Sequence, residues 1–127
     1  MDFEMLFKVA NEAKENAYAP YSNFKVGAAL LSKTGKIYSG CNIENASYSL
    51  TCCAERVAIF KAISQGETEF DTFIITSNTK APIAPCGACR QVMNEFFDEN
   101  VTIVLTNQTN KRKELSIKQL LPYAFDL

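Results

Sequence analysis

The sequence predicts an α/β fold in which helices pack in layers against a mixed sheet. Helical and extended patterns alternate along the chain in the order α, β, β, α, β, α, β, followed by a short helical segment. With 127 residues, 47% of them hydrophobic, the chain suits a single domain over residues 1–127 that buries roughly two-thirds of its unfolded surface. No internal repeat interrupts this order.

The first helix is predicted by apolar residues that recur at intervals of three and four between Phe3 and Ala17. Asp2 is a candidate N-cap, because its carboxylate can accept hydrogen bonds from the first free N–H groups. The pattern stops at Pro20, which disfavours helical backbone in the residue before it. We therefore expect a loop over residues 19–23.

Two strands are expected next, at residues 24–31 and 37–44. The four residues that join them include Gly35, which supplies the positive φ of a hairpin turn. Small residues occupy positions 27–29, so another element is expected to pack closely on the first strand.

A second helix is expected to begin near Thr51 or Cys52, after a polar loop at residues 45–49. Its apolar residues lie on nearly all sides, which is typical of a buried helix. Gly66 is the expected C-terminal stop.

The second half of the chain supplies two more strands and two more helices. Residues 73–76 form a short apolar run that suits a central strand, and residues 101–105 form another. A helical pattern begins at Cys86, and Ser116 with Gln119 fits a capping box before a short final helix.

Composition limits the possible partners. The net charge is −1, and the basic residues are scattered singly, which disfavours a nucleic-acid-binding surface and favours a small substrate of little charge. No signal peptide, membrane span or lipidation motif is apparent, so we expect a cytoplasmic protein without membrane partners.

The chain has five cysteines and no histidine, so a zinc ion could be held only by sulfur or carboxylate. The odd number and the missing signal peptide argue against a disulfide scaffold. Cys41 and Cys52 are expected to be small buried apolar residues. Cys52 could also be a zinc ligand, either in place of its neighbour Cys53 or together with it in a closed site of four thiolates.

Three further cysteines suit a catalytic zinc site. Cys53, Cys86 and Cys89 would supply three thiolates and leave one tetrahedral position open for water. Glu55 lies two residues after Cys53, within reach of protons on that water. A Cys-x-x-Cys pair alone could equally be a redox pair or half of a structural zinc site, and Glu55 could be an ordinary first-turn acid.

The two motifs together resemble the cytidine and deoxycytidylate deaminase superfamily, whose signature is His or Cys, x, Glu, followed by Pro-Cys-x-x-Cys. Glu55 then has the family's offset from Cys53, which favours Cys53 over Cys52. The resemblance implies a three-layer α/β/α sandwich with a mixed central sheet and one Zn²⁺ per chain. It also implies zinc-dependent hydrolytic deamination of cytidine and deoxycytidine to uridine and deoxyuridine, with ammonia released, in pyrimidine salvage. In this reaction Glu55 protonates N3 of the base and passes a proton to the departing amine.

Residues 24–28 and 42–48 resemble the segments with which free-nucleoside members bind base and ribose. Phe24 would lie against the pyrimidine, while Asn42 and Glu44, on one face of a strand, would hold the ribose hydroxyls. Without the motif, these residues would be a core phenylalanine and a solvated strand end. The resemblance also implies a homotetramer in which a neighbouring subunit contributes an aromatic residue, matched here by Phe125, to the substrate pocket. In all, it assigns substrate contacts to Phe24, Asn42, Glu44, Tyr48, Ala54 and Phe125.

Three thiolates and Zn²⁺ carry a formal charge of −1, which weakens the metal as a Lewis acid. Arg56 directly follows Glu55 and could offset this charge by donating hydrogen bonds to the thiolates. Arg90 follows Cys89 in the same way, although either arginine could instead lie on the surface.

Two other interpretations of the sequence are possible. A blasticidin-type deaminase would share the zinc motifs and the size but not the Asn42 and Glu44 pair. A noncatalytic zinc or redox module would need the cysteines but not Glu55.

Overall fold

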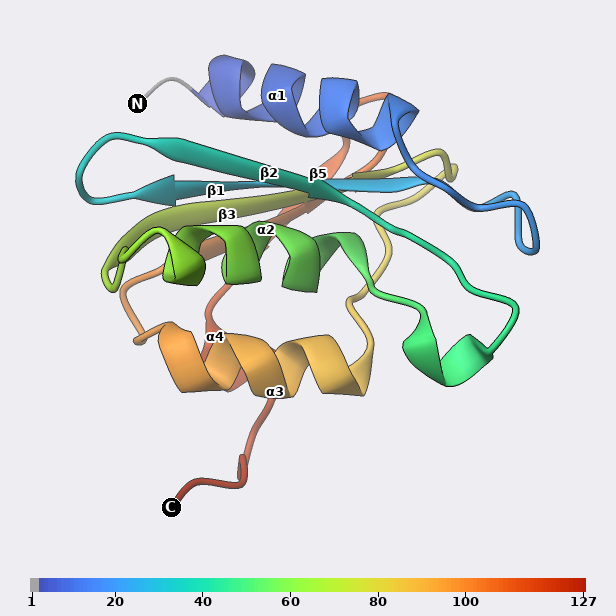
Figure 1. Cartoon of the computed structure of the whole chain (residues 1–127). Coiled ribbons are helices and arrows are strands. Elements are labelled where there is room, and N and C mark those ends of the chain that lie inside the picture. The colour runs from blue at the N-terminus through green and yellow to red at the C-terminus, as the bar shows by residue number, and fades with distance from the viewer. Residues whose placement is uncertain (1–2) are drawn as a thin grey trace.

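Residues 3–127 are described by a computed structural model, in which a five-stranded sheet lies between helices on both faces (Figure 1). This confirms the predicted α/β sandwich. Among the helices of these residues, none is both long enough and apolar enough to cross a membrane. In chain order the elements are α1 (Phe3–Glu15), β1 (Val26–Ser32), β2 (Ile37–Cys41), the 3₁₀ helix Tyr48–Leu50, α2 (Ala54–Ser64), β3 (Phe70–Ser77), α3 (Gly87–Phe96), β4 (Thr102–Thr106), β5 (Arg112–Leu115) and α4 (Ile117–Leu120).

The sheet is mixed, with the strand order β2-β1-β3-β4-β5. β3 and β4 are parallel, and each of the other neighbouring pairs is antiparallel. The expected hairpin joins β1 to β2, and Gly35 in its turn has a φ of 91°. Since a parallel pair requires a crossover, α3 connects β3 to β4 across one face.

Side chains of β1 alternate between the two faces of the sheet, which divides the core into two parts. Ala28 and Leu30 belong to the larger part, on the face covered by α2, α3 and α4, which lie below the sheet in Figure 1. Ala29 and Leu31 belong to the smaller part, where Leu6 and Ala10 of α1 cover the opposite face. All of β1 is buried, as expected for a strand with helices on both sides.

The parallel pair determines where the helix N-termini lie. α2 runs back toward the start of β3, and α3 runs from the end of β3 to the start of β4. Both helices therefore begin at the carboxyl ends of these strands, on the right in Figure 1. Open α/β sheets commonly bind ligands at the carboxyl ends of their strands.

The expected elements need four corrections, and one expectation is not tested. β2 ends at Cys41 instead of residue 44, and beyond it Ile43 makes only isolated bridges to Tyr18 and Cys52. α2 begins at Ala54, later than expected, and it is not buried all round because Phe60 is 47% exposed. The edge strand β5, whose sequence is mostly charged, was not predicted. The proposed N-cap Asp2 lies outside the described residues.

Two glycines allow helices to approach the sheet closely, and one of them, Gly27, lies where the small residues at 27–29 predicted a close contact. A Cβ at Gly27 would lie 2.1 Å from the carbonyl oxygen of Ala10 in α1. On the opposite face, a Cβ at Gly40 would lie 2.6 Å from both the carbonyl oxygen of Ala54 and the amide nitrogen of Ala58. Gly40 thus sets how near the N-terminus of α2 lies to β2.

Substituting alanine for Gly40 should therefore destabilise the protein. The added methyl would meet backbone atoms of α2, and overpacking of this kind costs about 1–3 kcal/mol of unfolding free energy. We expect the melting temperature to fall by several degrees in a calorimetric or circular-dichroism scan. Gly87→Ala is the matched control, because nothing lies within 4 Å of a Cβ there. Equal melting temperatures for the two variants would contradict the packing argument.

Candidate active site

Cys53 and Cys86 are the N-cap residues of α2 and α3. Both have the extended backbone typical of an N-cap, with φ and ψ of −73° and 153° at Cys53 and −68° and 165° at Cys86. The Cys86 Sγ accepts a hydrogen bond from the backbone N–H of Cys89, 3.5 Å away. Free N–H groups at both helix ends favour negative charge on these sulfurs.

The three predicted ligands are close enough to share one metal ion. The sulfur atoms of Cys53, Cys86 and Cys89 all lie within 4.8 Å of one another. Two sulfurs bound to one tetrahedral zinc are roughly 3.8 Å apart, and the Sγ atoms of Cys53 and Cys86 are separated by 3.9 Å. All three cysteines are free, so the Cys-x-x-Cys pair is not a disulfide in this structure. The cluster therefore fits a zinc ion.

The cluster has three members, and in residues 3–127 no fourth cysteine or carboxylate belongs to it. Cys52 does not belong to the cluster, and its backbone pairs with Ile43 through two hydrogen bonds of 2.9 Å. Cys52 and Cys41, expected to be small buried apolar residues, are only partly buried. A three-thiolate site leaves the open position that distinguishes catalytic from structural zinc.

Hydrogen bonds within the cluster favour a thiolate at Cys53. Its pKa is lowered to about 5, chiefly by a hydrogen bond from the Cys89 thiol and, more weakly, by Arg56. The same hydrogen bond, together with burial, raises the pKa of Cys89. Cys53 is therefore the more readily ionised of these two ligands.

The two arginines beside the motifs have different partners. A guanidinium nitrogen of Arg56 donates to the Cys53 Sγ at 3.4 Å, as expected for charge compensation. The Nε of Arg56 is buried and has no hydrogen-bond partner among the described residues. Arg90 instead donates to the carbonyl oxygens of Pro85 and Leu120 at 2.8 and 2.7 Å. Arg90 thus fixes the loop before Cys86, and it does not contact a thiolate.

Glu55 is an acid with an unusual environment. It lies in the first turn of α2, and its side chain is 5% exposed. Burial is the main reason that the pKa of its carboxyl is raised to about 7, and the negative charge of Cys53 adds to this effect. A carboxyl with such a pKa can both accept and donate a proton near neutral pH.

A cavity of about 200 Å³ joins Glu55 to the cysteine cluster. Its wall is mostly apolar, so a ring could enter it while polar atoms face the two cysteines and Glu55. Three of the predicted substrate contacts, Phe24, Asn42 and Ala54, line this cavity. The complete lining is Phe24, Val26, Asn42, Thr51, Cys53, Ala54, Glu55, Ile83, Ala84 and Cys86.

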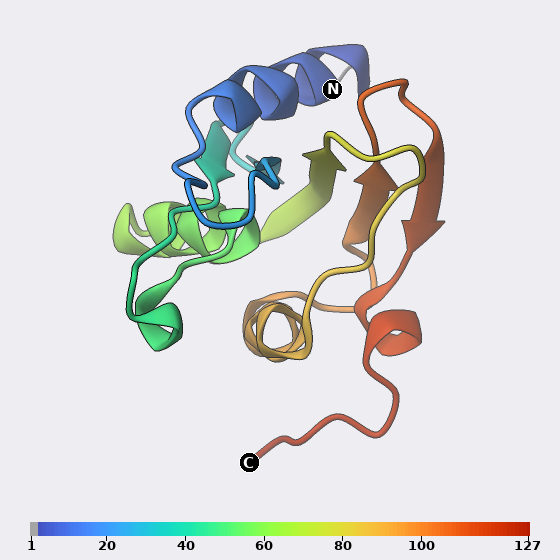
Figure 2. The same cartoon turned by 90° about the vertical axis from the view of Figure 1, so that its right-hand side faces the viewer.

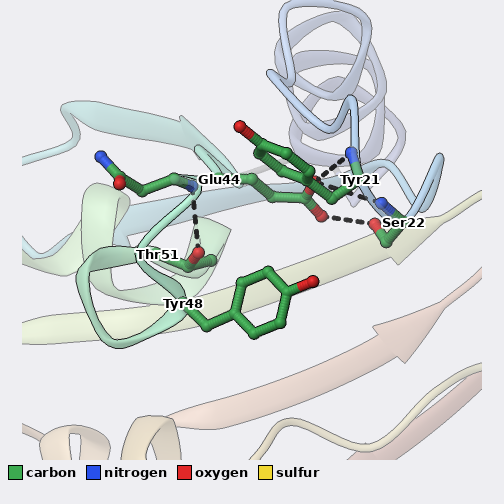
Figure 3. Close-up of a pocket in the computed structure, with 6 residues that line it drawn as sticks. Tyr21, Ser22, Glu44, Tyr48 and Thr51 are labelled. Carbon is green, nitrogen blue, oxygen red and sulfur yellow. Dashed lines mark hydrogen bonds between the residues drawn. The ribbon is translucent and has the colours of Figure 1, made fainter.

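A second cavity, of about 340 Å³, adjoins the first at Thr51, which lines both. Figure 3 shows that Glu44 and Tyr48 reach this second cavity from the segment after β2, while Tyr21 and Ser22 come from the loop before β1. The ring of Tyr48 is 76% exposed. The structure thus divides the predicted substrate residues between two adjoining cavities.

Asn42 and Glu44 hold the loop before β1, a role that the sequence did not indicate. Asn42 accepts a hydrogen bond from the N–H of Val26 at 2.9 Å and donates to the carbonyl oxygen of Phe24 at 2.7 Å. The carboxylate of Glu44 accepts hydrogen bonds from the N–H groups of Tyr21 and Ser22 and from the Ser22 hydroxyl. No local pattern could have revealed these contacts, because they span 16 to 23 residues.

Phe125 lies outside both cavities. It is 69% exposed, and only its carbonyl oxygen is held, by the side chains of Gln91 and Asn94 in α3. Figure 2 shows the C-terminal segment passing beneath α3. In this single chain, Phe125 does not meet the other predicted substrate residues.

The chain is similar to known proteins over nearly its whole length. Residues 2–105 match the family model described as the cytidine and deoxycytidylate deaminase zinc-binding region. A cytidine deaminase from Sporosarcina psychrophila is 50% identical over 125 residues, which are 98% of this chain and 92% of that protein.

A solved structure and a more distant relative extend the comparison. The crystal structure of a cytidine deaminase from Burkholderia pseudomallei has a TM-score of 0.95 and 50% identity, covering 98% of this chain and 100% of that one. A blasticidin-S deaminase from Bacillus cereus is 30% identical over 94% of this chain and 89% of its own length.

Proposed function

The chain belongs to the cytidine and deoxycytidylate deaminase family, and we propose that it hydrolyses free cytidine and deoxycytidine to uridine and deoxyuridine with release of ammonia. This family domain binds zinc, and the Cys53, Cys86 and Cys89 cluster can hold a metal ion. The observation that carries the proposal is the buried Glu55, whose pKa of about 7 suits proton transfer beside an open metal position. A noncatalytic zinc module would not need such an acid.

When bound at this cluster, zinc supplies the Lewis acid that activates the attacking water. Glu55 would then accept one proton of the attacking water at its carboxylate and deliver it to N3 of the pyrimidine. It would accept the second proton of that water from the new C4 hydroxyl and transfer it to the amine, which leaves as ammonia. The mostly apolar wall of the smaller cavity would exclude bulk water and keep these transfers between Glu55 and the base.

The two adjoining cavities suggest how a nucleoside would lie. We propose that the base occupies the smaller cavity, between Phe24 and Ala54, with the sugar directed toward the second. The ribose would then lie between Asn42, which lines the smaller cavity, and Glu44 and Tyr48, which line the second. This order preserves the substrate contacts expected from the resemblance.

We propose that the whole chain acts as one domain and assembles as a homotetramer. The exposed aromatic residues Phe60, on a helix that is apolar on nearly all sides, and Phe125 support assembly, because a neighbouring subunit could cover them. A neighbouring subunit would bring its Phe125 to the site. Five free thiols suit the reducing cytoplasm, and the expected role is pyrimidine salvage.

The test is ammonia release from cytidine by the zinc-loaded protein, with deoxycytidine and blasticidin S compared at equal concentration. We expect turnover of both nucleosides and little of blasticidin S.

Native protein should also prefer cytidine to cytidine 3′-monophosphate and to a short cytosine-containing oligonucleotide, because Glu44 would repel a 3′-phosphate. Glu44→Ala should lower kcat/KM for cytidine and reduce the difference in kcat/KM between cytidine and cytidine 3′-monophosphate. No ammonia from either nucleoside, or equal efficiency on the oligonucleotide, would refute the proposal.

Arg56→Gln should weaken zinc binding by about 10- to 100-fold, as loss of a ligand's hydrogen-bond partner commonly does. Arg56 lowers the pKa of Cys53, so its loss lets protons compete better with the metal. The pH at which half the zinc is released should therefore move upward, measured with a chromophoric chelator. Lys118→Gln removes the same charge at an exposed ion pair and should leave the release curve unchanged. Identical curves for both variants would leave Arg56 without a role at the metal.

A further inference from the structure

Ser22 is not among the residues that the family resemblance assigns to the site. Resting on the function proposed above, we propose that Ser22 is a positioning residue that fixes the Glu44 carboxylate for recognition of the sugar 3′-hydroxyl. Its hydroxyl donates to one carboxylate oxygen of Glu44, and its backbone N–H donates to the other at 3.2 Å. The N–H of Tyr21 adds a third hydrogen bond at 2.9 Å (Figure 3).

The direction of the Ser22 hydroxyl is determined by Phe24. The backbone N–H of Phe24 donates to the Ser22 Oγ at 3.0 Å, which occupies one acceptor position of that oxygen. The single hydroxyl proton is then free to point at Glu44, 22 residues away in the chain. Ser22 therefore connects the residue proposed to contact the base with the residue proposed to contact the sugar.

The carboxylate keeps room for a ligand. An ionised carboxylate offers about four acceptor positions, and the loop uses three of them. These hydrogen bonds lower the pKa of Glu44, the one from Ser22 most strongly, so the group remains ionised at neutral pH. Both Ser22 and Glu44 line the second cavity, where one acceptor position remains for a hydroxyl of the substrate.

The expected signature is a change in binding and not in chemistry. Ser22→Ala removes the hydroxyl but keeps both backbone donors, so Glu44 becomes less firmly oriented. KM for cytidine should rise by about 3- to 10-fold, in the range of losing one hydrogen bond to a charged group. Since the cysteines and Glu55 are untouched, kcat and zinc content should stay close to native. Ser22→Thr retains the hydroxyl and should restore most of the affinity.

The decisive test is a double-mutant cycle between Ser22→Ala and Glu44→Ala, measured with cytidine and 3′-deoxycytidine. If Ser22 acts through Glu44, its substitution should change KM by less than about twofold once Glu44 is alanine. Ser22→Ala should have the same small effect on KM when Glu44 is kept and the substrate is 3′-deoxycytidine, which lacks the 3′-hydroxyl. Ser49→Ala serves as the control, because Ser49 is an exposed serine in the neighbouring 3₁₀ helix.

Several outcomes would overturn this inference. A rise in KM that persists in the Glu44→Ala background, or that is equal for 3′-deoxycytidine, would mean that Ser22 acts only through loop structure. An unchanged KM for Ser22→Ala would remove Ser22 from the site. Failure of the proposed function is distinguishable, because native protein would then release no ammonia from cytidine at all.

Discussion

Cys89→Ala should eliminate the bound zinc and reduce cytidine turnover below detection. The side chain is fully buried, and its sulfur is one of only three ligands available among residues 3–127. The substitution also removes the thiol that donates to Cys53, so the pKa of Cys53 should rise and the remaining pair should bind metal less well. Metal analysis after dialysis against a weak chelator should show the zinc content falling from one ion per chain to nearly none.

Cys41→Ala is the matched control for this experiment. Cys41 is a half-buried free thiol at the end of β2, and it lies outside the cluster. This variant should therefore retain one zinc per chain. Cys86→Ala should behave like Cys89→Ala, although Cys86 is exposed, because both sulfurs belong to the same cluster. Full zinc retention in both ligand variants would reject the three-thiolate site.

Local patterns, together with the family resemblance that favoured Cys53 over Cys52, were enough to predict the metal cluster and most of the elements. The Cys-x-Glu and Pro-Cys-x-x-Cys motifs place Cys53 and Cys86 at helix starts, and these starts meet because β3 and β4 are parallel. The capping box at Ser116 and Gln119 was also correct, since both of its hydrogen bonds are present. Each motif spans only a few positions, whereas the meeting of the two helix starts follows from the order of helices and strands along the chain.

The parts that escaped prediction depend on distant contacts. Strand periodicity suggested that residues 42 and 44 continue β2, but Asn42 is 8% exposed because its side chain bonds the backbone of residues 24 and 26. β5 has no apolar alternation, and its position comes from pairing with β4 at the edge of the sheet. Neither effect leaves a local signal in the chain.

The apolar character of α2 was predicted correctly, but its burial was not. A helix that is apolar on nearly all sides normally requires cover all round, yet Phe60 remains 47% exposed in this single chain. A homotetramer, as proposed above, would supply the missing cover. The sequence pattern thus indicates burial that residues 3–127 of one chain do not provide.

Glu55→Gln should leave zinc bound while lowering kcat by about 10²- to 10⁴-fold, the usual contribution of a general acid–base group. Glutamine nearly matches the shape of glutamate, so the tight surroundings of α2 should tolerate it, but an amide cannot accept and return a proton. The native carboxyl is 5% exposed, and its pKa of about 7 suits both transfers. Steady-state ammonia release and metal analysis on the same sample measure the two effects separately.

Two further variants separate loss of the proton carrier from damage to the site. Glu67→Gln alters another buried glutamate, which bonds Thr34 and Tyr38 away from the cysteines, and it should keep near-native kcat. Glu55→Asp keeps an ionisable group but shortens its reach by one methylene, so its kcat should fall between those of native protein and Glu55→Gln. If Glu55→Gln turned over cytidine at nearly the native rate with zinc in place, Glu55 would be only a first-turn residue of α2, and the proton would have to be carried by another group.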